Sequence, residues 1–444
     1  MRIISKVINK IFLSLVNFIL VLNLFVSCSG QDTVENPIEV SEIKSDNSNL
    51  VSETDFASDE IESEASELSK QDLIDDYNQF WTILKENYPY YEYLAEKGMD
   101  YDGLMETGAT QIKRISDAPG LAFVLNQQCR QLGNFAHLAV VDGNTYSIYK
   151  NILENGTEEE KENYEPWLKY ISDDVTADTY ELMYPESETD SINSTESVEY
   201  DYPEIRTRYI EDCSMAVFII SLFDYNIVDR DSGVVEDYIE ELYSEGKSVE
   251  NIVFDLTSCS GGADNYWAQN IVKPFGGNWE WEDTVYFSDS EVVNDYFVKY
   301  DYINLQDYDD LAESNIKIDD SINIKWYSEY VWNFQLGDEQ YSDARRWVLI
   351  NHNVYSSSEK FVRFCKETGW AELVGSNTTG DGSGPGPVFM KLDNTGLLIQ
   401  FSADIAFNDD GTLNAEYGTS PNYLSDLGEE LDRCIEVAKY GPQK

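Results

Sequence analysis

Apolar positions recur at three- and four-residue spacings in residues 72–87, a stretch that is followed by Pro89. This spacing predicts an amphipathic helix that ends before the proline. Residues 101–115 and 121–132 show similar patterns, and Gly133 follows the second of them. Three helices with short connections predict a small helical bundle over residues 71–140.

After residue 205 the pattern changes to short apolar runs that alternate with helical stripes. The predicted elements are buried strands at 216–222, 252–256 and 347–350, helices at 234–246 and 357–367, and a hairpin at 388–401. This alternation predicts an α/β core over residues 205–440. Two stretches lack a clear period. Residues 141–204 predict an acidic insert or flap, and residues 275–344, rich in Tyr, Trp and Asp, predict a long insertion in the core.

The N-terminus combines a basic start with an apolar run over residues 11–26. The run is shorter than the ~20 residues of a membrane-spanning helix, so residues 1–28 predict a secretory signal. Residues 25–28 read Phe-Val-Ser-Cys and resemble the lipobox of bacterial lipoproteins, whose cysteine is lipidated and becomes the mature N-terminus. The resemblance implies that Cys28 is a lipid anchor to the cell membrane, with the protein on the extracytoplasmic face.

The chain has 444 residues, of which 84 are acidic and 30 basic, so its formal charge is −54. Residues 29–70 contain many Ser, Glu, Asp and Asn and few large apolar side chains, which predicts a disordered, charge-extended tether. The charge argues against nucleic acid as a partner and against direct adhesion to anionic lipid headgroups. Two histidines argue against a multi-histidine metal site, and six cysteines against a disulfide-built scaffold.

A first candidate for chemistry lies between a predicted buried strand and a predicted helix, where residues 356–359 read Ser-Ser-Ser-Glu. A hydroxyl at such a turn lies at a helix N-terminus, where free backbone N–H groups favour a developing oxyanion. The same residues also satisfy the capping box of an ordinary helix, with Ser356 as the cap and Glu359 as its partner. The pattern alone leaves both interpretations open.

Further candidates lie elsewhere in the chain. Gly261 and Gly262 directly follow a predicted strand and would let the backbone approach a ligand, with a plain turn as the alternative. His137 is a candidate general base, and a histidine hydrogen-bonded at a helix-to-strand junction is the alternative. His352 is interpreted as structural. Glu416 follows a turn and is a candidate for orienting a histidine, or else a solvated surface carboxylate.

Together these segments resemble the tail-specific (C-terminal-processing) serine peptidase family, and more closely its tricorn-type branch. The similar segments occur in the family's order. They are residues 134–138 (D-x-H-T-like), 255–262 (D-L-R-x-N-x-G-G-like), 356–359 (S-A-S-E-like), 373–382 (V-G-E-x-T-x-G-like) and 416–422 (E-G-x-G-V-x-P-D-like). The resemblance covers roughly residues 72–437, less the insertions.

The resemblance implies a crotonase-like spiral of β-β-α units beside the N-terminal helices. It also implies an endopeptidase that hydrolyses peptide bonds of peptides or unfolded proteins through an acyl-enzyme. Ser356 would be the nucleophile, His137 the base and Glu416 its support. The N–H of Ser357 and one from the glycine pair would form the oxyanion hole. No metal or organic cofactor is implied.

The sequence departs from the family at several positions. Members of the Ser/Lys type have a lysine where this chain has Asp381, which favours the set with histidine. Tricorn-type members have a serine before the histidine, where this chain has Ala136. Thr257 and Cys259 replace the usual Arg and Asn of the glycine segment, and the chain has no room for a PDZ domain. Cys259 is either a second nucleophile or a buried spectator.

These departures keep a second function open, a catalytically inactive peptide-binding lipoprotein on the same scaffold. A third class, the solute-binding lipoprotein of a transporter, shares the predicted anchor and the acidity. That class predicts two similar lobes, and the sequence shows no such duplication.

Overall fold

The structure is a computed structural model that describes residues 68–185, 203–299, 303–311 and 321–441. The predicted signal peptide with Cys28, and nearly all of the predicted tether, lie outside the described residues. None of the helices in the described ranges is sufficiently long and apolar to cross a bilayer.

The α/β core is built on a six-stranded sheet with the order β13–β9–β8–β4–β3–β2. The strands are β2 (Arg206–Ile210), β3 (Met215–Ile219), β4 (Asn251–Asp255), β8 (Arg345–Ile350), β9 (Glu372–Gly375) and β13 (Tyr423–Leu424). Only β2 pairs in the antiparallel direction, and the other pairs are parallel. Parallel strands are covered on both faces, which explains their continuous apolar runs. The predicted strands at 216–222, 252–256 and 347–350 are confirmed as β3, β4 and β8.

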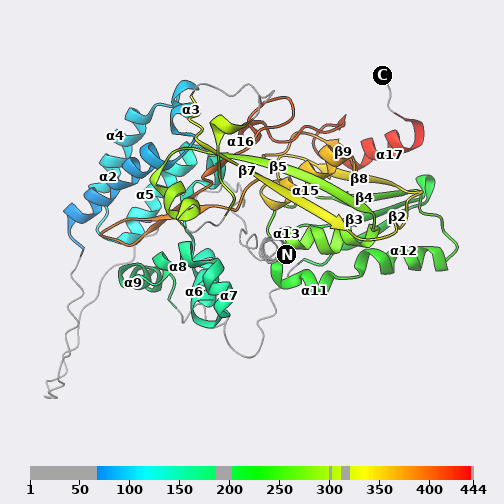
Figure 1. The fold of residues 1–444 in the computed structure, drawn as a ribbon, viewed down its shortest axis with the longest axis horizontal. Helices are drawn as coiled ribbons and strands as arrows, with labels where there is room; N and C mark the ends of the chain where they lie inside the picture. Colours follow the sequence, from blue (N-terminus) through cyan, green and yellow to red (C-terminus); the bar gives the residue numbers. More distant parts are fainter. Residues whose placement is uncertain (1–67, 186–202, 300–302, 312–320, 442–444) are drawn as a thin grey trace, which may run out of the picture.

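Helices cover both faces of this sheet (Figure 1). Val217, Val253 and Leu349 pack against α17 (Glu430–Tyr440) on one face. Their alternate neighbours, such as Phe218 and Phe254, pack on the other face with α12 (Val234–Ser244), α13 (Asp264–Trp267) and α15 (Ser357–Thr368). The first nine of the twelve residues of α15 are buried.

The stretch 275–344, predicted to be an insertion without a clear period, contains two ten-residue strands. They are β5 (Asn278–Phe287) and β7 (Trp326–Gln335), which pair along their whole length and are joined at the edges by β6 (Gln306–Asp307) and β12 (Asp404–Ile405). The period was hidden because adjacent aromatic side chains are buried on opposite faces, as Tyr286 and Phe287 are at the end of β5. In Figure 1 these strands run from the N-terminal helices to the far side of the core.

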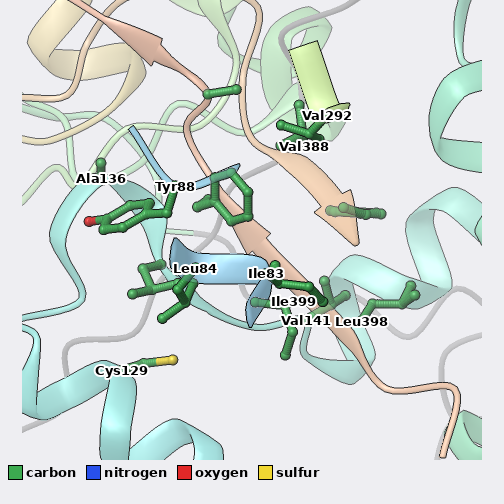
Figure 2. Close-up of a cluster of buried hydrophobic side chains, with 14 of the residues drawn as sticks. Ile83, Leu84, Tyr88, Cys129, Ala136, Val141, Val292, Val388, Leu398 and Ile399 are labelled. Carbon is green, nitrogen blue, oxygen red and sulfur yellow. The ribbon is translucent and has the colours of Figure 1, made fainter. Parts of the chain in front are cut away.

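The three predicted N-terminal helices are confirmed as α2 (Lys70–Asn87), α4 (Tyr101–Ile112) and α5 (Ala118–Gln131), with the short α3 (Tyr91–Glu96) between the first two. They pack on a three-stranded sheet in the order β1 (Ala139–Val140), β11 (Leu398–Phe401) and β10 (Val388–Lys391). The predicted hairpin is therefore confirmed as β10–β11. Figure 2 shows Leu84 of α2, Val141 and Ile399 in one apolar cluster, so segments far apart in the sequence share a core.

The acidic stretch after residue 141 is helical as far as residue 183. It forms α6 (Gly143–Asn155), α7 (Glu158–Asn163), α8 (Glu165–Ile171) and α9 (Asp174–Met183), where a flap or a loop-rich insert was predicted. Trp167 of α8 is buried, and its Nε1 donates to the carbonyl of Pro387 at 2.9 Å. The molecule is thus a mixed α/β protein with N-terminal helices, as the sequence predicted.

Candidate active site

Ser356 lies in the turn between β8 and α15, with φ 57° and ψ −128°. A non-glycine residue is rarely left-handed, and a strained strand-to-helix turn of this kind projects a nucleophilic side chain away from the backbone. Within the described residues, the Ser356 side chain makes no capping hydrogen bond to α15. The capping-box interpretation of this segment is therefore wrong.

The other residues of the predicted capping box have different partners. The Ser358 hydroxyl lies 2.8 Å from the carbonyl of Cys259 and accepts from the Tyr355 N–H at 3.1 Å. The Glu359 carboxylate accepts hydrogen bonds from Asn414 at 2.8 Å and Thr419 at 2.6 Å. Burial raises the pKa of Glu359. These contacts fix the first turn of α15 and leave the Ser356 hydroxyl to face the pocket.

The glycine turn after β4 lies directly against the nucleophile turn. Gly261 has φ +108°, and a Cβ there would come within 2.6 Å of the Tyr355 carbonyl and 2.9 Å of the Ser357 nitrogen. Gly262 has φ +126°, and a Cβ there would come within 2.1 Å of the Phe223 carbonyl. Both positions therefore require glycine, because of close backbone approach and of backbone conformation. The structure brings Ser357, Gly261 and Gly262 together.

His137 ends the 3₁₀ turn η1 (Phe135–His137) between α5 and β1. The N-terminal helices and β11 hold this turn in place. The Tyr88 hydroxyl donates to the Phe135 carbonyl at 2.7 Å, and the Ser402 N–H donates to the Ala136 carbonyl at 2.8 Å. Tyr88 and Ala136 lie close together in the cluster of Figure 2. The imidazole is thus carried by a segment that two distant parts of the chain fix.

The Nδ1 atom of His137 contacts the Asp381 carboxylate and lies 3.0 Å from the Ser402 hydroxyl. A carboxylate can only accept, so Nδ1 carries the proton and Nε2 of the neutral ring is the basic nitrogen. The Ser402 hydroxyl also donates to Asp381 at 3.0 Å. The imidazole and the carboxylate are almost buried, with side chains 9% and 5% exposed.

Tyr355, directly before the nucleophile, completes this cluster. Its hydroxyl accepts from the backbone N–H of His137 at 2.9 Å and donates to Asp381 at 3.0 Å, and its ring centroid lies 4.5 Å from the imidazole. Burial, and then the Asp381 charge, raise the pKa of Tyr355 well above its ordinary value, so the hydroxyl stays protonated and can donate. Asp381 therefore has three hydrogen-bonding neighbours: an imidazole, a phenol and the Ser402 hydroxyl.

The carboxylate predicted to support His137 is not the one that the structure places there. Glu416 lies on α16 (Asn414–Tyr417), and its side chain accepts from the Tyr93 hydroxyl and pairs with Lys97 at 3.5 Å. Although α16 packs near η1, its carboxylate turns to the N-terminal helices. The prediction of Glu416 as the partner of His137 is corrected to Asp381.

The backbone is strained at all three members of the Ser356–His137–Asp381 set. Among the described residues, seven non-glycine residues have positive φ, and Ser356 (57°), His137 (58°) and Asp381 (57°) are three of them. Two more, Asn134 and Ala136, lie in the histidine turn. Such conformations cost ~1–3 kcal/mol each and persist where surrounding contacts enforce them, which is common at active sites.

One pocket connects these groups. It is lined by His137, Ser356, Ser357, Gly262 and Asp381 together with residues of the segment 382–387. Cys259 is fully buried nearby, and burial raises the pKa of its thiol to about 12, so it is a spectator at neutral pH. The His352 side chain is exposed, and its carbonyl accepts from Thr379, in line with a structural role.

Sequence reasoning missed Asp381, Ser402 and Tyr355 as members of the site. Asp381 was noted only as the residue in the place of a family lysine. The position itself was a signal in the sequence. A loop that places a lysine beside the nucleophile can also place a carboxylate beside the histidine base. The Ser402 hydroxyl contacts both His137 and Asp381, and no local pattern in the sequence marks it.

Solved structures of known proteins resemble this fold. A chain from Parabacteroides merdae ATCC 43184 is 16% identical with a TM-score of 0.48, over 82% of this chain and 96% of the other. Mature CPAF is 12% identical with a TM-score of 0.47, over 84% and 95%. The photosystem II D1 C-terminal processing protease is 15% identical with a TM-score of 0.30, over 52% and 47%. None of the curated proteins matches this sequence.

The family comparison concerns the α/β core. The matched stretch runs from β3 to β13 and contains the nucleophile turn, the glycine turn and Asp381, while His137 precedes it. The predicted resemblance to tail-specific serine peptidases is confirmed, because residues 216–425 match the model of peptidase family S41.

Proposed function

We propose that this protein is a serine endopeptidase in which Ser356, His137 and Asp381 hydrolyse peptide bonds through an acyl-enzyme. The observation that carries the proposal is the position of Ser356. It lies on a strained turn, its hydroxyl does not cap α15 within the described residues, and it lines a pocket together with a histidine that a carboxylate holds in place. If Ser356 served only to begin the helix, its hydroxyl would accept a hydrogen bond from a backbone N–H of the first turn. A histidine that only filled space would need no three-way hydrogen-bond cluster behind it.

The reaction begins when His137 Nε2 takes the proton of the Ser356 hydroxyl and Oγ bonds to the substrate carbonyl carbon. Asp381 stabilises the imidazolium that forms, and it keeps the proton of the neutral ring on Nδ1. The C–N bond then breaks, and the leaving amine takes the proton from Nε2. Water, deprotonated by the same nitrogen, then attacks the acyl ester; the ester C–O bond breaks, and the imidazolium returns the proton to Ser356 Oγ.

The negative oxygen of the tetrahedral intermediate would be held by backbone N–H groups of Ser357 and Gly262. Both residues line the pocket, and the nitrogen of Ser357 lies at the first turn of a helix, where the helix dipole favours negative charge. Each such donor contributes about 3 kcal/mol to transition-state stabilisation in other enzymes. Peptides or unfolded proteins are the proposed substrates, since the match to a peptidase family favours them.

A serine-directed fluorophosphonate tests the proposal on the full chain. We expect the wild type to be labelled at Ser356 and the Ser356→Ala variant to remain unlabelled, with equal melting temperatures. A Ser358→Ala variant keeps the nucleophile and should still be labelled at Ser356, which separates labelling of the nucleophile from labelling of the neighbouring serine. A folded wild type that resists labelling and cleaves no member of a peptide library would contradict catalysis and favour the inactive peptide-binding lipoprotein.

We also propose that lipid on Cys28 anchors the protein to the extracytoplasmic face of the cell membrane. The support is the sequence alone: the basic start, the apolar run and the cysteine that follows it. Metabolic labelling with a palmitate analogue should mark the wild type and miss a Cys28→Ala variant. Equal labelling of both chains would exclude the anchor.

A further inference from the structure

Two buried charged side chains join the nucleophile turn to the glycine turn. Lys360 lies one helical turn after Ser356 on α15, and Asp264 begins α13 two residues after Gly262. Lys360 Nζ lies 2.8 Å from Asp264 Oδ2, and the two side chains are 2% and 3% exposed. Burying a charged pair costs desolvation free energy that its attraction often only balances, so such a pair is weak evidence for stability. Its position suggests another use.

The oxyanion hole needs two donors that come from segments almost a hundred residues apart in the chain. One donor would be the N–H of Ser357 on α15, and the other the N–H of Gly262 after β4. Donors must lie within about 3 Å of the developing oxyanion, so the spacing between the segments controls the rate.

Two side chains of α15 hold the glycine turn from either side. Before the glycines, the Ser358 hydroxyl lies 2.8 Å from the Cys259 carbonyl. After them, Lys360 contacts Asp264. The Lys360 ammonium also donates to the Gly384 carbonyl at 3.2 Å, in the segment that forms another wall of the pocket. Lys360 therefore ties the nucleophile helix to two walls of the site at once.

We propose that Lys360 and Asp264 are positioning residues that hold the Gly262 and Ser357 N–H groups at the spacing of an oxyanion hole. This inference rests on the proposed serine peptidase function. Lys360 also lines the pocket, but the role assigned to the pair is positional. The pair acts through the backbone of the glycine turn.

The test compares the wild type with a Lys360→Met/Asp264→Asn double variant of the full chain. Removing both charges avoids the unpaired buried charge that a single substitution would leave, so the double variant should fold. Fluorophosphonate labelling places a tetrahedral phosphorus centre, with its oxygen, where the oxyanion would lie. We expect the maximal labelling rate to fall about 100-fold, the loss that a misplacement of ~1 Å can cause, with little change in the probe concentration at half-maximal rate. The Lys360→Arg variant, which keeps a cation, should recover much of the rate.

A control is the Lys391–Asp173 pair, which also joins two distant segments through a lysine and an aspartate, at 2.7 Å, with side chains 23% and 29% exposed. It links β10 to the start of α9 and does not line the pocket. The Lys391→Met/Asp173→Asn variant should be labelled at the wild-type rate. An equal loss of rate in both double variants would show a general effect of removing ion pairs and would overturn the proposal, as would a folded Lys360→Met/Asp264→Asn protein labelled at the wild-type rate.

A second measurement does not depend on turnover. Crystal structures of the wild type and of the Lys360→Met/Asp264→Asn variant would give the separation between the Gly262 and Ser357 nitrogens. We expect the glycine turn of the variant to move by about 1 Å relative to α15. An unchanged separation would overturn the inference even if the wild type proved inactive, whereas absent labelling of the wild type would count against the proposed function alone.

Discussion

The two sides of the pocket are built in different ways. The nucleophile side is local: β8, a strained turn and α15 follow one another in the chain, and the glycine turn packs against them through backbone contacts. The histidine side is assembled from four separate positions, His137, Tyr355, Asp381 and Ser402. A local arrangement leaves a motif in the sequence, whereas an assembled one leaves isolated residues without a common pattern.

The largest expected effect on the labelling rate concerns Asp381, the carboxylate on the histidine side. We expect Asp381→Asn to lower the rate of fluorophosphonate labelling by about 10⁴-fold, because an amide no longer holds the proton on Nδ1 or balances the imidazolium. Intact melting behaviour would show that the loss is chemical.

The matched control is Glu416→Gln, which makes the same chemical change at the carboxylate that faces Tyr93 and Lys97. We expect it to be labelled at the wild-type rate. If Glu416→Gln lost activity and Asp381→Asn kept it, the correction from Glu416 to Asp381 would itself be wrong.

The nucleophile side should be most sensitive at its backbone. We expect Gly261→Ala to slow labelling by about 10²–10³-fold, the loss of one oxyanion donor, since the new Cβ would push the turn away from the Tyr355 carbonyl and the Ser357 nitrogen. Labelling rates and denaturant unfolding measure the two consequences separately.

The Gly246→Ala variant separates the effect of backbone strain from the effect of a steric clash. Gly246 also has a positive φ, of +78°, but a Cβ there would meet nothing within 4 Å. This variant should lose a little stability and no activity. A loss of activity equal to that of Gly261→Ala would point to general destabilisation.

A smaller effect is expected from the hydroxyl groups that support Asp381. Hydrogen bonds to charged groups contribute about 1.5–3 kcal/mol. Part of this hydrogen-bond free energy should stabilise the transition state, so we expect Ser402→Ala and Tyr355→Phe each to slow labelling about tenfold. The double variant tests whether they act on one carboxylate, because shared action makes the combined loss differ from the sum of the single losses.

The smallest effect concerns a buried carboxyl near the histidine side. Burial, and then the Asp381 charge, raise the pKa of Asp404 well above its ordinary value. Between the pKa of Asp404 in the unfolded chain and its higher pKa in the folded protein, only the folded protein binds this proton. The free energy of unfolding therefore falls as the pH rises through the folded pKa. We expect Asp404→Asn to be more stable than the wild type at about pH 8 and to lose this advantage below about pH 4.

Urea unfolding at both pH values measures this effect, and Asp410→Asn serves as a control of opposite sign. Hydrogen bonds from Thr412 lower the pKa of Asp410, so its contribution to stability is present at neutral pH and is lost on acidification. A gain in stability from Asp410→Asn at about pH 8 would contradict this account of both carboxyls.

The sequence allowed prediction of the parts whose signal is local. Buried parallel strands such as β4 showed as continuous apolar runs, and the N-terminal helices showed as apolar stripes of helical period. The strands β5 and β7 were missed because aromatic side chains on both faces hid the two-residue alternation. Ser356, His137 and the glycine turn were predicted from their motifs. Asp381 and Ser402 depend on contacts across 244 and 265 residues, which no window of sequence contains.

The hydrogen bond from the Ser402 N–H to the Ala136 carbonyl has a consequence for synthesis of the protein. Ser402, at the end of the β11 segment that fixes the histidine turn, is made 265 residues after His137. When Ser356 has left the ribosome during synthesis, Ser402 has not, so the histidine turn still lacks this hydrogen bond. Hydrolytic competence should therefore arise only after Ser402 has left the ribosome, which would protect shorter, unfinished chains from one another.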